Sequence, residues 1–322
     1  MGRANFRAHE PGLSRKVACG TWRTAGDPSV YALLEIEMSK ALEFAAAYSN
    51  QHGVRITPTL LAAKAITHCL QVRPELNGLL RHGRVYLRQN VSIFFQVNVP
   101  GRAVKGSRDE RIAKAVLSGT TVHETDTKSL GEIARAFRAQ AADVKRGRDH
   151  SFGASMRIVS LLPWRLVRSF LSLVSWLVYG LNLNLGFLGL PNDPFGSVMI
   201  TNVGGMGIDV AWAPLVPYTR VPLLLALGTI RDKAVVENGE VKARPVLSIG
   251  VTFDHRLIDG VHAAQMSNEF KKCFADPARY FGGNCPGSGE GVSPVKGRPA
   301  LRSCKAGETP RAAGETPAPL PE

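Results

Sequence analysis

Residues 246–260 read VLSIGVTFDHRLIDG, and this stretch decides the fold. The run from Val246 to Asp254 is apolar and rich in β-branched residues, which predicts a buried strand. The strand leads into His255 at a tight turn, and a helix is expected from about Gly260. A titratable side chain at the end of a buried strand lies where a sheet commonly borders a cleft. His255 is therefore the first candidate for a functional residue.

The residues after His255 strengthen this interpretation. Asp259 follows four positions later, where a carboxylate can hold the turn by hydrogen bonding or by pairing with a cation. Gly260 permits backbone geometry that bulkier residues resist. A lone histidine in a turn is more often a structural residue with a satisfied hydrogen bond, so the flanking pattern is what favours function.

Helix and strand signals alternate on the N-terminal side of this stretch. Apolar and β-branched runs predict strands over 30–38, 91–99, 197–203, 221–228 and 246–254. Helical periodicity predicts helices over 39–51, 57–73, 127–144 and 260–275. The pattern indicates a mixed α/β fold with helices packed on one large sheet. The glycines of 204–207 do not have the spacing of a dinucleotide-binding or P-loop turn.

Several of these segments resemble one family, the dihydrolipoamide acyltransferase (E2) catalytic domains of 2-oxoacid dehydrogenase complexes. The most specific is DHRLIDG at 254–260, which is similar to the family's D-H-R-x-x-D-G signature. The resemblance covers roughly residues 14–282, and its other segments are SVMITNVG at 197–204, the stretch 209–230, TKSLGEIA at 127–134 and SRKVA at 14–18. It implies a chloramphenicol acetyltransferase-like sandwich, with a large mixed sheet and helices packed on it.

The resemblance also implies a site and a mechanism. His255 matches the catalytic base, and Thr201 matches a position, usually serine, whose hydroxyl stabilises the tetrahedral oxyanion. Asp259 is expected to make the turn rigid by pairing within it. The residues expected to support the turn and the strand end are Asp254, Arg256, Gly260 and Asn202.

The family transfers acyl groups between coenzyme A and the dithiol of lipoamide. Coenzyme A or acyl-CoA is therefore the expected substrate, the lipoyl group is expected only in trans, and no metal is expected. Family members assemble as homotrimers or larger assemblies of trimers with the active site between subunits. His255 and Thr201 are thus expected to meet across a subunit boundary, and a lipoyl-bearing protein is a possible partner.

The composition is consistent with these expectations. The net charge of +14 favours an anionic ligand, and without zinc-finger spacing or an RNA-binding aromatic motif no nucleic acid partner is expected. The cysteine count is five, with no C-x-x-C pair, which argues against a disulfide framework and a structural zinc site. Without an apolar signal-peptide core, a cytoplasmic location is expected, with membrane association as an alternative.

Three divisions of the chain are expected. Residues 1–14 are expected to form a flexible arm, residues 15–282 the acyltransferase domain, and residues 283–322 a disordered tail rich in Gly, Pro and Ser. The domain contains an apolar helical insert at about 157–191, of which 169–191 carry no charged residue. The insert is expected either to pack on the protein, to contact a membrane surface, or to span a membrane.

Two alternatives to a lipoamide acyltransferase stay open at this point. No lipoyl domain precedes the catalytic segment in this sequence, which leaves room for a non-catalytic core or scaffold subunit. The apolar insert leaves room for a membrane-associated acyltransferase with a different acceptor.

Overall fold

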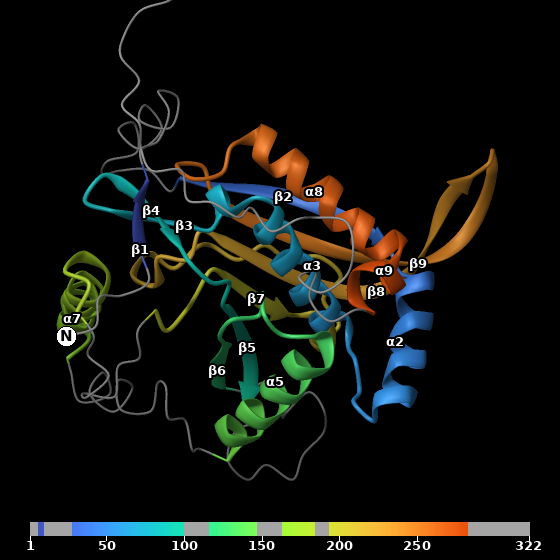
Figure 1. Cartoon of the computed structure of the whole chain (residues 1–322), viewed down its shortest axis with the longest axis horizontal. Helices are drawn as coiled ribbons and strands as arrows, with labels where there is room; N and C mark the ends of the chain where they lie inside the picture. The colour runs from blue at the N-terminus through green and yellow to red at the C-terminus, as the bar shows by residue number, and fades with distance from the viewer. Residues whose placement is uncertain (1–5, 10–27, 100–115, 147–162, 184–192, 283–322) are drawn as a thin grey trace, which may run out of the picture. The chain divides into compact units, whose positions relative to one another are not determined.

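A six-stranded mixed sheet forms the centre of the computed structural model, which describes residues 6–9, 28–99, 116–146, 163–183 and 193–282 (Figure 1). The strand order is β2-β9-β8-β7-β5-β6, and neighbours are antiparallel except for the parallel pairs β8–β7 and β7–β5. The strand bounds are β2 Ser29–Glu37, β5 Ile93–Val99, β6 Val116–Val122, β7 Val198–Asn202, β8 Leu223–Glu237 and β9 Glu240–Asp254. The prediction of a mixed α/β fold with a large mixed sheet is confirmed.

Helices cover one face of this sheet and enclose the main core. Side chains from alternate sheet positions, such as Ile36, Leu225 and Ile249, pack there against the apolar sides of the helices. The helices are α2 Ser39–His52, α3 Pro58–Val72, α5 Leu130–Lys145, α8 Gly260–Ala275 and α9 Pro277–Phe281. The helix predicted from residue 127 begins at Leu130, because Ser129 and Glu132 form a capping box that fixes its start.

An extended segment crosses the opposite face of the sheet over two glycines. A Cβ at Gly228 would lie 1.8 Å from the carbonyl oxygen of Asp209, and one at Gly250 would lie 1.9 Å from that of Ala211. No side chain fits at either position, so glycine is what lets this segment lie against the strands. The indole N–H of Trp212 then donates to the carbonyl of Ala32 in the edge strand β2 at 2.9 Å.

A smaller sheet of order β1-β4-β3 lies beside the main one, with bounds β1 Phe6–His9, β3 Gly78–Arg81 and β4 Arg84–Arg88. β1 falls within the expected flexible arm, and that expectation is wrong for these four residues because they pair with β4. The rest of the arm and the whole of the expected tail lie outside the described residues. A short 3-10 turn, η1 Pro74–Leu76, joins α3 to β3.

The described part of the insert is helical and packs on the smaller sheet. It comprises α7 Trp164–Ser175 and a π-helical turn, η2 Trp176–Gly180. Val178 and Tyr179 are buried against Leu79 and Tyr86. None of the helices among the described residues is long and apolar enough to cross a membrane.

Strands β8 and β9 extend well beyond their predicted bounds at residues 228 and 246. They continue past the sheet as a two-stranded ribbon (Figure 1), closed at Asn238 and Gly239, which both have positive φ. Asn-Gly is a strong hairpin signal in a sequence, but the flanking charges obscured it. Those charges pair across the ribbon, as Arg244 does with Glu237 at 2.6 Å.

The crossing segment gives a test of this packing. We expect Gly250→Ala to lower the unfolding free energy by about 1–3 kcal/mol, the usual range for an overpacked site. The melting temperature should therefore fall by several degrees, which differential scanning calorimetry measures. Gly205→Ala is the matched control, since nothing lies within 4 Å of the position that a Cβ would take there. Equal melting temperatures for the two variants would contradict the close approach described above.

Candidate functional site

The turn that carries His255 is fixed by main-chain hydrogen bonds to both neighbouring strands. The His255 amide donates to the carbonyl of Pro28 at 2.9 Å, next to the start of β2, and the Asp254 amide donates to that of Pro222 at 2.9 Å. The amides of Leu257 and Ile258 both donate back to the carbonyl of Asp254. Leu257 and Ile258 are buried in the core, so the half-buried His255 is presented by a rigid loop.

Asp254 is the carboxylate that pairs across this turn. It is buried, and its two oxygens accept from Arg256 Nε at 2.9 Å and Nη2 at 2.7 Å. It also accepts from the Arg256 amide at 2.9 Å. A bidentate ion pair between residues two positions apart restricts both side chains and the backbone between them. His255 is the residue enclosed by this pair.

Asp259 has a different position from the one expected. It is the N-cap of α8, and its Oδ1 accepts from the His262 amide at 2.9 Å and lies 2.7 Å from His262 Nδ1. The turn-closing ion pair that the sequence suggested for Asp259 is made by Asp254. The physical reason is that Asp259 already begins the helix, where its carboxylate faces the exposed amides of the first turn.

Thr201 and Asn202 end strand β7. Thr201 is buried and pairs with Ala226, so its side chain is on the face opposite the main helices. Asn202 donates from Nδ2 to Thr59 Oγ1 at 2.9 Å and accepts from the Gly205 amide at 3.2 Å. Asn202 thereby ties the end of β7 to the start of α3 and to the loop that follows.

The strand register keeps Thr201 and His255 apart within one chain. Val198, Leu223 and Phe253 form one row across β7, β8 and β9, with Thr201 three residues to one side of that row and His255 two residues to the other. Five residue steps and two strand spacings amount to about 19 Å at a rise of ~3.3 Å and a strand separation of ~4.8 Å. Side chains of this size cannot close that distance.

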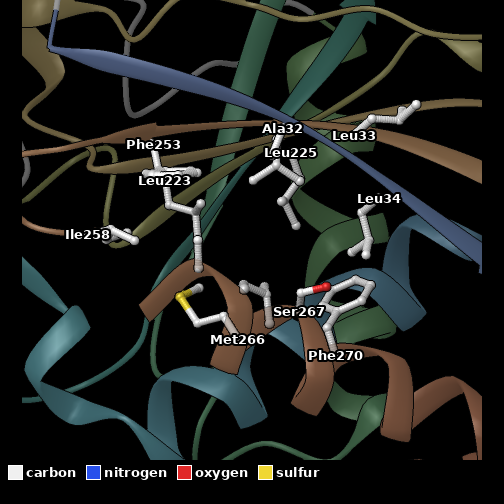
Figure 2. Close-up of a pocket in the computed structure, with 13 residues that line it drawn as sticks. Ala32, Leu33, Leu34, Leu223, Leu225, Phe253, Ile258, Met266, Ser267 and Phe270 are labelled. Carbon is white, nitrogen blue, oxygen red and sulfur yellow. The ribbon is translucent and has the colours of Figure 1, made fainter. Parts of the chain in front are cut away.

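An apolar pocket of about 80 Å³ lies between α8 and strands β2, β8 and β9 (Figure 2). Phe253 and Ile258, on either side of the His255 turn, contribute to one end of its lining, and Leu34 and Phe270 to the other. Ser267 supplies the one hydroxyl of the lining. A hydrocarbon lining of this kind favours a short alkyl group over a charged one.

The structure adds Arg220, which the sequence did not single out. It has a positive φ of 56° two residues before Pro222, and it donates to the carbonyl of Leu80 at 3.3 Å and to Ser175 Oγ of the insert at 3.4 Å. Burial, followed by the nearby Arg256, lowers the pKa of its guanidinium. Only the fold brings these residues together, so no local sequence signal pointed to Arg220.

Within the described ranges, no group of three or more His, Cys, Asp or Glu side chains could hold a metal ion. The described cysteines, Cys69 and Cys273, are buried. Burial raises the pKa of Cys273 to about 12, so this thiol is not activated as a nucleophile at neutral pH.

Comparison with known proteins finds one family and several solved structures that this chain resembles. Residues 194–281 match the family described as 2-oxoacid dehydrogenases acyltransferase (catalytic domain). The chain is 40% identical over 81 residues to the dihydrolipoyllysine-residue acetyltransferase component of the pyruvate dehydrogenase complex of Bacillus subtilis. That match covers 25% of this chain and 18% of the relative, so the chain aligns with under a fifth of the relative's length.

Two solved structures share the fold over most of the chain. The cubic core of the pyruvate dehydrogenase multienzyme complex aligns with a TM-score of 0.56 at 18% identity, covering 83% of this chain and 88% of that one. The dihydrolipoamide acetyltransferase of Azotobacter vinelandii aligns with a TM-score of 0.55 at 17% identity, with the same coverage. A serine, a histidine and an asparagine of the Azotobacter protein have been investigated for roles in its catalytic mechanism.

The two aspartates flanking His255 can be separated by one pair of variants. Asp254→Asn removes the negative charge that forms the bidentate ion pair with Arg256, and we expect the unfolding free energy to fall by about 1–3 kcal/mol. Asp259→Asn keeps a good helix N-cap, so we expect a change within about 0.5 kcal/mol. Urea unfolding followed by circular dichroism measures both values. A larger loss for Asp259→Asn would show that the assignment of the two carboxylates is wrong.

Proposed function

We propose that the protein transfers an acyl group between coenzyme A and a thiol acceptor such as dihydrolipoamide, because residues 194–281 match the 2-oxoacid dehydrogenase acyltransferase family. The observation that carries the proposal is the position of His255. It ends a buried strand in a turn fixed by Pro28, Pro222 and the Asp254–Arg256 pair. Such a rigid turn suits a side chain that must meet its substrate in one geometry.

The proposed reaction begins with proton transfer. A thiol with a pKa near ~8.5 is mostly protonated at neutral pH, so a base must remove its proton. His255 would take that proton as the sulfur attacks the carbonyl carbon of the thioester. The tetrahedral intermediate then expels the other thiolate, which receives the proton back from His255. Proton and acyl group are both conserved, and no oxidant or metal is needed.

Thr201 is the proposed donor to the oxyanion of this intermediate. It is the buried hydroxyl of β7, in the segment that resembles the family's serine-containing strand. In the Azotobacter protein the serine precedes the histidine by about fifty residues and the asparagine follows it by four. Thr201 and Asp259 stand at similar separations from His255. Asp259 differs from asparagine in having no N–H to donate, so we assign it to the N-terminus of α8 and to His262.

The separation of Thr201 and His255 supports a site shared between two copies of the chain. With about 19 Å between them along the ladder, each would have to find its partner on another subunit. A cyclic homotrimer provides this arrangement three times, since every interface in it is the same heterologous contact. A solved structure with a fold like this one is the cubic core of the pyruvate dehydrogenase multienzyme complex. We therefore propose a homotrimer or a larger assembly of trimers.

The substrates are proposed on the same basis. Acyl-CoA is the proposed donor, and the net charge of +14 would attract its phosphates. The acceptor is proposed to be a dihydrolipoyl group on another protein. The alternative of a non-catalytic scaffold predicts an assembled protein that turns over neither substrate.

Single and mixed variants test both parts of the proposal. With acetyl-CoA and dihydrolipoamide, we expect His255→Ala to reduce the rate of thioester formation by about 10²–10⁴ and Thr201→Ala by about 10²–10³. Thr201→Ser keeps the hydroxyl and should retain most of the activity. Circular dichroism and light scattering establish that each variant stays folded and assembled.

Mixing the two inactive variants tests the shared site. After co-expression in equal amounts, a quarter of the interfaces would join an intact His255 to an intact Thr201, so about a quarter of the wild-type activity should return. Separately purified variants mixed without subunit exchange should stay inactive. No recovery in co-expressed mixed trimers would contradict a site built from two subunits, and an active His255→Ala variant would exclude His255 as the base.

A further inference from the structure

Helix α7 and its π-helical continuation expose large apolar side chains on the side turned away from the protein. Leu166, Leu173 and Trp176 are 52%, 53% and 44% exposed, and Leu181 just beyond them is 43% exposed. The spacing of 166, 173 and 176 places these three on one face of the helix. We call these four residues the outward face.

The opposite side of the same element is firmly packed. Val178 and Tyr179 are buried with Leu79 and Tyr86 of β3 and β4, and Val174 packs beside them. The carbonyl of Gly180 accepts from Arg81 Nε at 2.7 Å and lies 3.1 Å from His82 Nε2. Figure 1 shows α7 beside the smaller sheet, away from the helices of the main core. A helix that is apolar on both sides and buried on only one needs a second apolar surface to cover the other.

The sequence that contains α7 is basic and free of acidic residues. Between Asp149 and Asp193 the sequence contains no acidic residue, but it contains Arg157, Arg165 and Arg168. The hairpin of β3 and β4, residues 78–88, carries three further arginines and no acidic residue. One of them, Arg88, is paired with Asp193 at 2.7 Å, and the others add to the positive charge. The outward face is therefore an apolar patch on an element that packs beside a basic border, the hairpin arginines Arg81 and Arg84.

From this arrangement we propose that the outward face docks on the surface of a bilayer containing anionic lipid, with α7 lying in the plane of the interface. Tryptophan and leucine enter the boundary between headgroups and acyl chains, and neighbouring arginines pair with lipid phosphates. A second copy of the chain fits this surface less well, because a self-contact would bring two basic borders together. The helix is too short to span the bilayer and would lie on it.

Docking in this way would hold the catalytic turn close to the lipid. The Ser175 hydroxyl of α7 accepts a hydrogen bond from Arg220. Two residues after Arg220, the carbonyl of Pro222 accepts from the amide of Asp254, which precedes His255. The docking proposal does not depend on the proposed acyl transfer, because it rests on α7 and the charges beside it. The His255→Ala variant should accordingly bind vesicles as the wild-type protein does.

Vesicle sedimentation with the full chain tests the proposal. We expect wild-type protein to sediment with vesicles of phosphatidylcholine and phosphatidylglycerol, and to bind pure phosphatidylcholine vesicles more weakly. Leu173→Glu and Leu166→Glu should each weaken binding by roughly tenfold or more, because each removes one leucine from the lipid. Raising the salt to 1 M should also weaken binding, as the screening length falls to ~3 Å.

Val236→Glu is the matched control, since Val236 is 69% exposed but lies on the distant β8–β9 ribbon. It should bind vesicles as the wild-type protein does, and melting curves should show all three glutamate variants folded. Failure of the wild-type protein to bind phosphatidylglycerol vesicles would overturn the proposal, as would unchanged binding by both α7 variants. A fall in the mass of the vesicle-free protein in Leu173→Glu would also overturn it, by identifying the face as a contact between copies.

Discussion

The hydrogen-bonded ladder of β7, β8 and β9 is the constraint on which the site depends. It sets the row in which every residue of these strands lies, and a strand cannot slip by one position without turning its buried side chains outward. Because β9 runs antiparallel to β8, the end of β9 that carries His255 lies at the edge of the sheet opposite to the end of β7 that carries Thr201. A single chain therefore presents the His255 imidazole at one end of the ladder and the Thr201 hydroxyl at the other. Chemistry that uses both requires a second copy.

The turn after β9 adds a local constraint to this global one. The Asp254–Arg256 pair, the two amides that donate to the Asp254 carbonyl and the burial of Leu257 and Ile258 all act on a few consecutive residues. Burying an ion pair carries a desolvation penalty. Here the bidentate geometry and an additional hydrogen bond from the Arg256 amide to Asp254 offset that penalty. The result is a histidine whose backbone has little freedom.

Much of this was predictable from the sequence where local patterns carry the information. The strand before His255, the helix from Gly260 and the mixed sheet follow from periodicity and capping, and they were predicted. The role of Asp259 was not, even though the helix start at Gly260 was predicted, because a carboxylate just before a helix can either cap it or pair within the preceding turn. Arg220 and the glycine crossings at 228 and 250 were not predictable, because they depend on segments that meet only in the folded chain. The β8–β9 ribbon had a usable signal in Asn238-Gly239, but its charged flanks resemble a loop.

The most direct measurement of the central claim is a crystal structure of the assembled protein with coenzyme A bound. The account predicts that the coenzyme thiol lies within hydrogen-bonding distance of His255 of one subunit, about 3–4 Å, with the Thr201 hydroxyl of the neighbouring subunit facing the position that the thioester carbonyl oxygen would take. A thiol placed between His255 and a hydroxyl of the same chain, or coenzyme A bound away from His255, would contradict it.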